Sequence, residues 1–246
     1  MPNKRIILFF LLAGFTTDLL AQFLGGQIKP PLSPYPGGTI HCNPLNRTVI
    51  VEVTNPTTGK IWMDRNLGAE QVATSSTDAL AFGDLYQWGR GPDGHQCRNS
   101  GTTTVSSAVD QPLHQDFIIV PTSSPTGDWR NPQNNSLWQG INGTNNPCPS
   151  GFRIPTREEL EQERISWNNN NAAGAYNSNL KLTLSGFRER TTGTISLTNV
   201  SGIPYGMLWT SSISGERAIF FAYYAGGAFD NPFERARGYG VRCIKN

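Results

Sequence analysis

The sequence predicts an α+β fold that is rich in loops, with a few short helices around a twisted antiparallel sheet. Glycine (26 residues) and proline (17) are frequent, and only 15% of the 246 residues are charged, which is typical of a protein with little helix. Short runs of alternating apolar and polar residues, separated by turn-forming residues, recur along the chain and indicate β-hairpins. Four cysteines add the expectation of two disulfides.

The first predicted hairpin joins residues 48–54 (TVIVEVT), where apolar and polar residues alternate, to 60–63 (KIWM) through the turn 55–59 (NPTTG). The cluster Asp64-Arg65-Asn66 follows directly. It could be catalytic, but we favour a buried polar cluster that fixes the loop to the sheet.

The second predicted hairpin joins residues 207–213 to 217–224 through a turn at 214–216. Both faces of the return strand are apolar, so we expect a strand that is covered on both sides. One face carries Ala218, Phe220, Ala222 and Tyr224, and the other carries Ile219, Phe221 and Tyr223.

A helix is predicted at 157–167, after a short strand at 152–154. Thr156 and Glu159 have the spacing of a capping box, in which each side chain accepts a hydrogen bond from the backbone N–H of the other residue. Glu158 and Glu159 also favour the positive end of a helix. The other predicted elements are a helix or helical turn within 75–88, an apolar segment at 116–120, a strand pair at 180–186 and 194–198, a loop at 225–237 and a closing strand at 240–244.

The start of the chain predicts export. Lys4 and Arg5 precede an apolar run at 6–15 that is too short to span a bilayer, and Ala21 is a small residue suited to cleavage. We therefore expect a signal peptide at 1–21, with a membrane anchor as the alternative, and then a Pro/Gly-rich leader at 22–47 and one domain at 48–246. No second long apolar run follows, so no membrane span is expected after cleavage. The mature protein would be secreted or at the cell surface, or in the periplasm.

The charge balance excludes two classes of partner. Without Lys4, Arg5 and Asp18, the chain has 18 basic and 17 acidic residues, so it offers no electrostatic attraction for nucleic acid or an anionic membrane.

The four cysteines allow three pairings in an oxidising compartment. We choose Cys42–Cys97 and Cys148–Cys243, because each bridge then closes one half of the chain. The rival hypothesis is a Cys97 thiolate activated by His95, two residues away.

The long loop tract 89–146 contains Trp129 and Trp138, which we expect to anchor it on the core rather than to stack on sugars. Its asparagines and carbonyls are oxygen donors of the kind that calcium takes, but no EF-hand spacing is present, so we expect no cofactor. Structural calcium is the alternative.

Four segments resemble the Fibrobacter succinogenes major paralogous domain, a family of exported bacterial proteins. They are NPTTGKIWMDRNLGA (55–69), FGDLYQWGRGPDGHQCR (82–98), NNPCPSGFRIPTREELEQE (145–163) and GYGVRCIKN (238–246). The family in turn resembles the C-type-lectin-like fold of the formylglycine-generating (sulfatase-modifying) enzymes, through FRIPTREELE (152–161) and the YGVRC end at 239–243. The resemblance implies a C-type-lectin-like mixed fold with few helices.

This resemblance also suggests a site. Relatives of the fold display ligand-contacting residues in the loop before the closing strand, here 225–237. The expected ligand-binding residues are Tyr223, Tyr224, Phe229, Asp230, Phe233 and Arg235, whose rings and charges suit sugar stacking or protein hot spots. The alternative is that these rings only pack the loop and bind no ligand.

We expect a non-catalytic binding or adhesion module for an extracellular glycan or protein. The alternative is a structural cell-surface component without a small ligand, which would have the same sequence features as a binding module. An enzyme of the sulfatase-modifying kind is disfavoured, because no cysteine lies between Cys148 and Cys243. No catalytic residues are expected, and His41, His95 and His114 have no metal-ligand spacing, so no metal site is predicted either.

Overall fold

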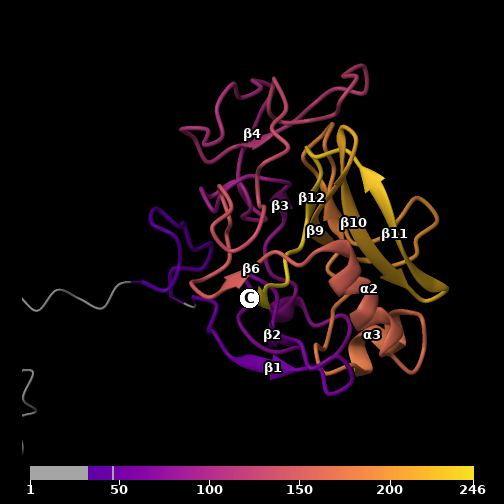
Figure 1. The fold of residues 1–246 in the computed structure, drawn as a ribbon. Helices are drawn as coiled ribbons and strands as arrows, with labels where there is room; N and C mark the ends of the chain where they lie inside the picture. Colours follow the sequence, from indigo (N-terminus) through magenta and orange to yellow (C-terminus); the bar gives the residue numbers. More distant parts are fainter. Residues whose placement is uncertain (1–32, 46) are drawn as a thin grey trace, which may run out of the picture. The chain divides into compact units, whose positions relative to one another are not determined.

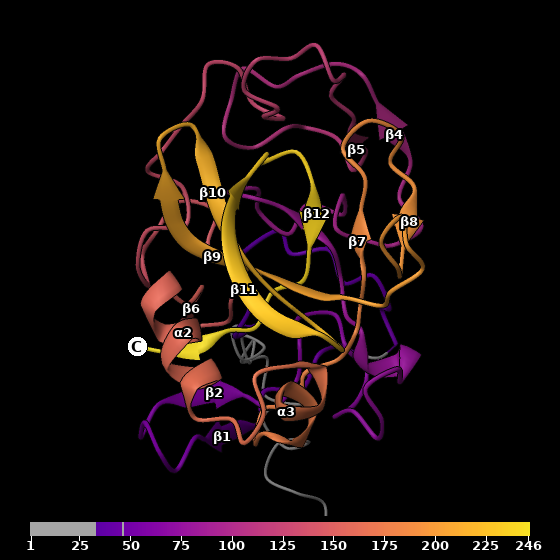
Figure 2. The same ribbon diagram turned by 90° about the vertical axis from the view of Figure 1, so that its right-hand side faces the viewer.

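The computed structural model describes residues 33–45 and 47–246, and its longest strands form a three-stranded antiparallel sheet in the order β11-β10-β9 (Figure 1). Strand β9 spans Gly206–Ser214, β10 spans Arg217–Tyr224 and β11 spans Gly227–Phe233. The predicted hairpin of β9 and β10 is confirmed. Figure 2 shows how strongly this sheet twists, with β11 along its edge.

The prediction of a loop over all of 225–237 is wrong in its first half. Ala225 and Gly226 make a tight turn, and the chain then pairs with β10 over seven residues. The strand forms because its backbone groups find partners along β10, while Phe229 and Phe233 pack on that strand. Glycine at 226 and 227 masked this hairpin in the sequence pattern.

The three-stranded sheet separates two apolar clusters, and β10 contributes to both. Ala218, Phe220 and Ala222 belong to the larger cluster, whereas Phe221 and Tyr223 belong to the smaller one. This confirms the prediction of a strand covered on both faces. The larger cluster includes the buried Trp88, Trp129, Trp138 and Trp209, and the smaller one includes Trp62, Leu160 and Trp167.

A second, four-stranded sheet brings distant parts of the chain together in the order β1-β2-β13-β6. The hairpin of β1 and β2 is confirmed, but β1 is shorter than predicted, because Val49 and Val51 are exposed and have no ladder partner. The strand bounds are Glu52–Thr54 for β1, Ile61–Met63 for β2, Phe152–Arg153 for β6 and Ile244–Lys245 for β13.

The predicted closing strand at 240–244 is mostly not a strand, because Gly240 makes only an isolated bridge to Leu208 and residues 241–243 belong to no ladder. Gly238–Tyr239 forms β12, which pairs with β3 and β7, and only Ile244 of the predicted range lies in β13. The chain crosses from one sheet to the other between them, with the buried Val241 and Cys243 in the larger cluster. The other strands of these small sheets are Tyr86–Gln87 (β3), Thr102–Thr103 (β4), Phe117–Ile118 (β5), Phe187–Arg188 (β7) and Ile195–Ser196 (β8).

The predicted strand pair is shifted along the chain. Residues 180–186 form no strand, since Leu180 lies in a turn and Lys181 and Gly186 have positive φ, and β7 begins at Phe187 to pair with β8. Leu180 and Leu182 are apolar because they fill the smaller cluster, so their pattern reports burial rather than sheet pairing.

The helices are few and short, as predicted. Helix α2 covers Arg157–Ile165 and begins with the predicted capping box of Thr156 and Glu159. Helix α3, Ala172–Asn177, is an element that the sequence pattern did not predict; it follows a run of asparagines, and the Asn171 side chain caps it. The predicted helix within 75–88 is reduced to one 3-10 turn, Ala79–Ala81.

Both predicted disulfides are present, Cys42–Cys97 and Cys148–Cys243. Trp129 and Trp138 are fully buried, which confirms that they anchor the long loop tract. Asn66 is also buried; it donates to Phe82 O and accepts from Arg242, as expected for a bracing polar cluster.

The predicted signal peptide (1–21) and residues 22–32 of the predicted leader lie outside the described residues. From Pro34 onward the leader belongs to the compact unit Pro34–Asn246. Tyr35 packs in the larger cluster and Cys42 is bridged to Cys97, so this part is not a free linker. No helix among the described residues has the length and apolar character needed to cross a bilayer.

Candidate functional site

Five aromatic side chains gather on and beside one face of the three-stranded sheet. Phe220, Tyr224, Phe229 and Phe233 share that face in the strand register, and Tyr205 precedes β9. We call these five residues the aromatic strip. Ring centroids lie 4.7 Å apart for Tyr205 and Tyr224, 6.0 Å for Phe220 and Phe229, and 5.6 Å for Phe220 and Phe233.

Small partners on β10 make room for the rings of β11. Phe229 lies opposite Ala222, and Phe233 lies opposite Ala218. Each phenyl ring can therefore lean over the neighbouring strand and meet Phe220 edge to face, the geometry that aromatic pairs prefer.

The aromatic strip runs from the core to the surface. Phe220 is 5% exposed and touches Tyr239 in the larger cluster, whereas Phe229 is 36% exposed. Tyr205, Tyr224 and Phe233 are half-buried. The inner ring thus holds the outer rings in place, and the outer rings offer apolar surface to a ligand.

A polar residue lies within the aromatic strip. Asn231 sits opposite Phe220 on β11, between Phe229 and Phe233, and is exposed. Its amide makes no hydrogen bond with any other residue that the structure describes. An exposed amide between two phenyl rings offers both a donor and an acceptor to a bound molecule.

Charges border the strip at the Phe233 end, and they are already paired. The Arg237 guanidinium lies 4.7 Å from the Phe233 ring centroid and 2.9 Å from Glu189 Oε1. Glu234 is 3.2 Å from Arg217. Because these ions neutralise one another, the strip favours an uncharged ligand group.

Three of the six predicted ligand-binding residues, Tyr224, Phe229 and Phe233, lie in the aromatic strip. Asp230 does not, because β11 is a strand and successive side chains point to opposite faces. Its carboxylate pairs with Arg157 of α2 at 2.9 Å.

Tyr223 and Arg235 are buried, which corrects their prediction as surface contacts. Tyr223 is fully buried between the strands and α2 and donates to Thr183 O, and burial raises the pKa of its phenol. Arg235 lies under the long loop tract, with its guanidinium 4.6 Å from the Trp88 ring centroid and 3.5 Å from Asp128. Both belong to the packing of the core.

Sequence reasoning missed Tyr205, Phe220 and Arg237 as members or neighbours of the site. Phe220 had a usable signal, since the alternation in β10 already placed it on the face of Tyr224. Tyr205 had none, because it lies outside the predicted strands and its place depends on a backbone hydrogen bond to Leu197 O that no local pattern indicates.

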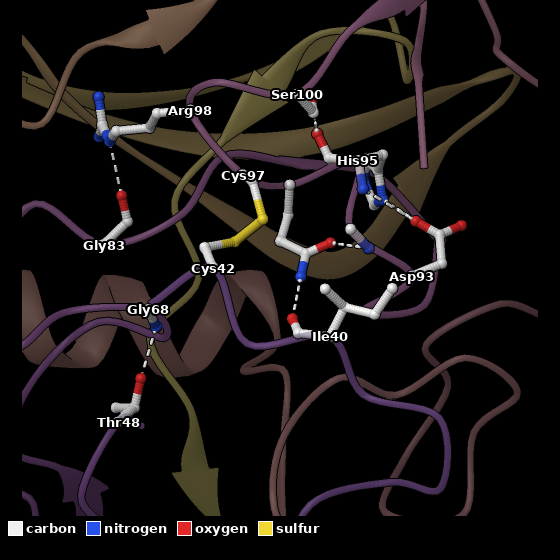
Figure 3. Close-up of a disulfide and its surroundings, with 12 residues drawn as sticks. Ile40, Cys42, Thr48, Gly68, Gly83, Asp93, His95, Cys97, Arg98 and Ser100 are labelled. Atoms are coloured by element: carbon white, nitrogen blue, oxygen red, sulfur yellow. Dashed lines mark hydrogen bonds and ion pairs between the residues drawn. A yellow bond between two sulfur atoms is a disulfide. The ribbon is translucent and has the colours of Figure 1, made fainter. Parts of the chain in front are cut away.

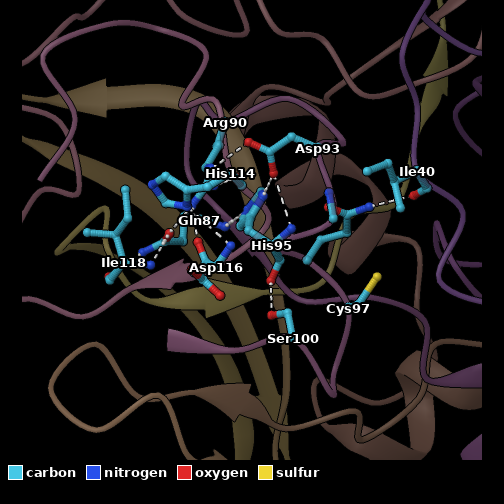
Figure 4. A network of polar contacts seen from close by, with 12 residues as sticks. Ile40, Gln87, Arg90, Asp93, His95, Cys97, Ser100, His114, Asp116 and Ile118 are labelled. Carbon is cyan, nitrogen blue, oxygen red and sulfur yellow. Dashed lines mark hydrogen bonds and ion pairs between the residues drawn. The ribbon is translucent and has the colours of Figure 1, made fainter. Parts of the chain in front are cut away.

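The alternative of a Cys97 nucleophile with a His95 base is wrong. Figure 3 shows the Cys97 sulfur bonded to Cys42, so no thiolate is available. The two ring nitrogens of His95 are also occupied, as Figure 4 shows within the polar network around it. Nε2 accepts the Gln87 N–H at 3.0 Å, so Nδ1 carries the proton and donates to Asp93 Oδ1 at 2.6 Å.

His95 is a structural residue of this network. It is fully buried, and desolvation lowers its pKa to about 4, so the ring is neutral at physiological pH. Asp93 also binds Arg90, whose guanidinium holds the carbonyls of His114 and Asp116. The network thereby fixes the loop tract to β3.

Metal-ligating side chains are dispersed. Within residues 33–45 and 47–246, no group of three or more His, Cys, Asp or Glu side chains gathers at a spacing that could hold a metal ion.

Comparisons of the chain with protein-family models, curated proteins and solved structures found no match. Its likeness to the Fibrobacter succinogenes major paralogous domain therefore rests on the four sequence segments alone.

Proposed function

We propose that this protein is an exported, non-catalytic binding or adhesion module of the C-type-lectin-like kind, and that its aromatic strip binds a glycan outside the cell. The observation that carries the proposal is the row of partly exposed rings held on a rigid sheet, with a free amide between them.

The chemistry of the strip suits a neutral sugar. The C–H face of a pyranose stacks on an aromatic ring, and its hydroxyls pair with an amide. Phe229 supplies the most exposed ring and Asn231 the amide. The neighbouring charges are already engaged, so a charged ligand would have to displace an existing ion pair.

The disulfides of the scaffold are consistent with a location outside the cytosol. All four cysteines are bridged, and such bridges persist in oxidising compartments. The expected signal peptide and the resemblance to exported bacterial proteins support the same placement. Protease treatment of intact cells tests it, since an adhesion module must be cleaved or released from the surface.

A glycan array with the mature protein tests the function, using Phe229→Ser combined with Asn231→Ala as the variant. Both residues are exposed, so the variant should fold. We expect at least a tenfold loss of affinity, because one stacking ring and one hydrogen-bonding amide are removed. Ile165→Ser is the control, since Ile165 is 67% exposed on α2, away from the strip.

Unchanged glycan binding by the double variant would remove the strip from the site. Capture of a protein through the strip, with no glycan bound, would replace the glycan by a protein ligand. The absence of both would favour the alternative of a structural surface component.

A further inference from the structure

A small cavity lies beneath the segment that carries Cys42, and one of its wall residues, Tyr86, contacts the His95 ring. Its volume is about 20 Å³, and its walls include Tyr35, Thr48, Asp84 and Tyr86. This is room for one water-sized particle and excludes an organic ligand.

One wall of this cavity is a buried carboxylate without a hydrogen bond. Asp84 is 6% exposed, and its backbone N–H is satisfied by Leu67 O. No donor among the described residues reaches its side-chain oxygens, and the carboxylate lies so close to Gly68 that a Cβ there would fall 2.2 Å from its carbon atom. Buried carboxylates are normally hydrogen-bonded or paired, so this one is an exception that needs an explanation.

Arg98 is the cation whose charge acts on Asp84, but it makes no hydrogen bond to the carboxylate. Its Nε donates to Gly83 O at 2.7 Å and another guanidinium nitrogen donates to Ser185 O at 2.9 Å. Figure 3 shows Arg98 directed at Gly83, the residue before Asp84. Arg98 therefore acts on Asp84 through its field and makes no hydrogen bond to the carboxylate.

Neutral oxygen atoms complete the walls. The Thr48 hydroxyl accepts the Gly68 N–H and keeps a further lone pair, as Figure 3 shows. The Tyr86 hydroxyl makes no hydrogen bond with another described residue, although Tyr86 is 3% exposed. Hard cations take carboxylate, hydroxyl and carbonyl oxygens of this kind.

We propose that the cavity walled by Asp84, Thr48 and Tyr86 binds a single monovalent metal cation of the size of sodium. One carboxylate supplies one negative charge, and Arg98 is a fixed positive charge close by. With Arg98 counted, the site would carry a net charge of about +1 with a monovalent ion and about +2 with a divalent ion, so the monovalent ion leaves less uncompensated charge in the buried site. The ion would join Thr48 to Asp84 and Tyr86, which lie more than 30 residues further along the chain, and would stabilise the fold in a saline environment.

The site's own electrostatics agree with this assignment. Desolvation raises the pKa of Asp84 to about 7, and the field of Arg98 offsets only part of that rise. A bound cation would lower that pKa and keep the carboxylate ionised.

Thermal unfolding of the mature protein in NaCl and in choline chloride, at equal ionic strength and pH 8, tests the proposal. Choline is too large for the cavity. We expect sodium at 150 mM to raise Tm by roughly 3 to 6 °C over choline, as for an ion bound with a Kd near 10 mM. The Asp84→Asn variant should have a higher Tm than the wild type in choline and no response to sodium.

Two further variants make the result specific. Asp128→Asn is the matched control, since Asp128 is equally buried but is hydrogen-bonded to Arg130 N–H and Gln133, so the sodium response should persist. Tyr86→Phe should weaken the sodium response without abolishing it. Equal Tm values of the wild type in sodium and choline would overturn the proposal, as would a response to calcium alone.

Discussion

Tyr205 and Tyr224 are stacked, with ring centroids 4.7 Å apart and ring planes 17° from parallel. Tyr205 directly precedes β9, and Tyr224 is the last residue of β10. The stack therefore joins the beginning and the end of the β9–β10 hairpin at its open end, opposite the turn. It also sets the angle at which Tyr224 meets Phe229, whose centroid is 6.3 Å away. The outer end of the aromatic strip therefore depends on a residue outside the three strands.

The Tyr205→Ala variant should weaken ligand binding, because it removes one ring of the aromatic strip and the stacking partner of another. Tyr224 would lose its stacking partner and gain rotational freedom, so we expect a threefold to tenfold rise in Kd and a loss of stability of roughly 1 kcal/mol. Titration of an array-selected glycan and chemical unfolding measure the two effects. Tyr205→Phe keeps the stack and should behave as the wild type. Equal binding by Tyr205→Ala would show that the stack does not order the site.

Loss of the Cys148–Cys243 bridge should destabilise the domain more than loss of Cys42–Cys97. The first closes a loop of 95 residues and the second a loop of 55, so the chain-entropy model gives about 4 to 5 kcal/mol for each, with the larger value for the longer loop. Urea unfolding of the two paired Cys→Ser variants measures the difference. The reverse order would mean that native contacts, rather than loop length, decide the contribution of each bridge.

Two buried groups should give stability–pH slopes of opposite sign. His95 has a pKa lowered to about 4, so its contribution is complete above pH 6.5 and is lost as the pH falls towards 4. Asp84 has a pKa raised to about 7, so its carboxyl favours the folded state at low pH, and that contribution is lost as the pH rises from about 4 to 7.

These slopes nearly cancel between pH 4 and 6.5 in choline chloride, where each is about 1.4 kcal/mol per pH unit. Asp84→Asn should uncover the rise of stability with pH that His95 produces. His95→Gln should uncover the opposite slope. Urea unfolding from pH 4 to 8 measures all three proteins, and a wild-type profile that Asp84→Asn leaves unchanged would contradict the assignment to Asp84.

Arg235 should matter for folding rather than for binding. The Arg235→Ala variant would leave Asp128 buried without its ion partner and would uncover the Trp88 ring, so we expect a loss of roughly 3 to 5 kcal/mol. Arg217→Ala breaks an ion pair with Glu234 in which the arginine is largely solvent-exposed, and it should cost less than about 1 kcal/mol. Calorimetric unfolding compares them. A folded Arg235→Ala protein that loses only glycan affinity would return Arg235 to the ligand-binding surface.

Short-range sequence patterns predicted the structure correctly where residues close in sequence form it. The capping box of Thr156 and Glu159 needs only a three-residue spacing, and the two faces of β10 need only strict alternation. The even cysteine count and the halves of the chain that each pair closes were enough for the two bridges. These predictions held because each depends on short-range geometry or on a simple count.

The candidate site was only partly accessible in this way. Tyr224, Phe229 and Phe233 were identified from their position in or beside the loop that precedes the closing strand. Asp230 and Arg235 were grouped with them because a loop has no fixed alternation, whereas Tyr223 was included although the alternation of its strand already placed it on the face opposite Tyr224. Once β11 pairs with β10, alternate residues must face opposite sides, and Asp230 turns to Arg157.

The sequence by itself determined the class of fold and the central hairpin, since periodicity acts locally, and its even cysteine count predicted two disulfides. The tertiary structure alone decided which rings reach the surface and why Asp84 is without a hydrogen bond. Those properties depend on contacts between distant segments, such as Tyr205 with Tyr224 and Asp84 with Gly68. Burial is a property of the whole packed chain, and no local pattern specifies it.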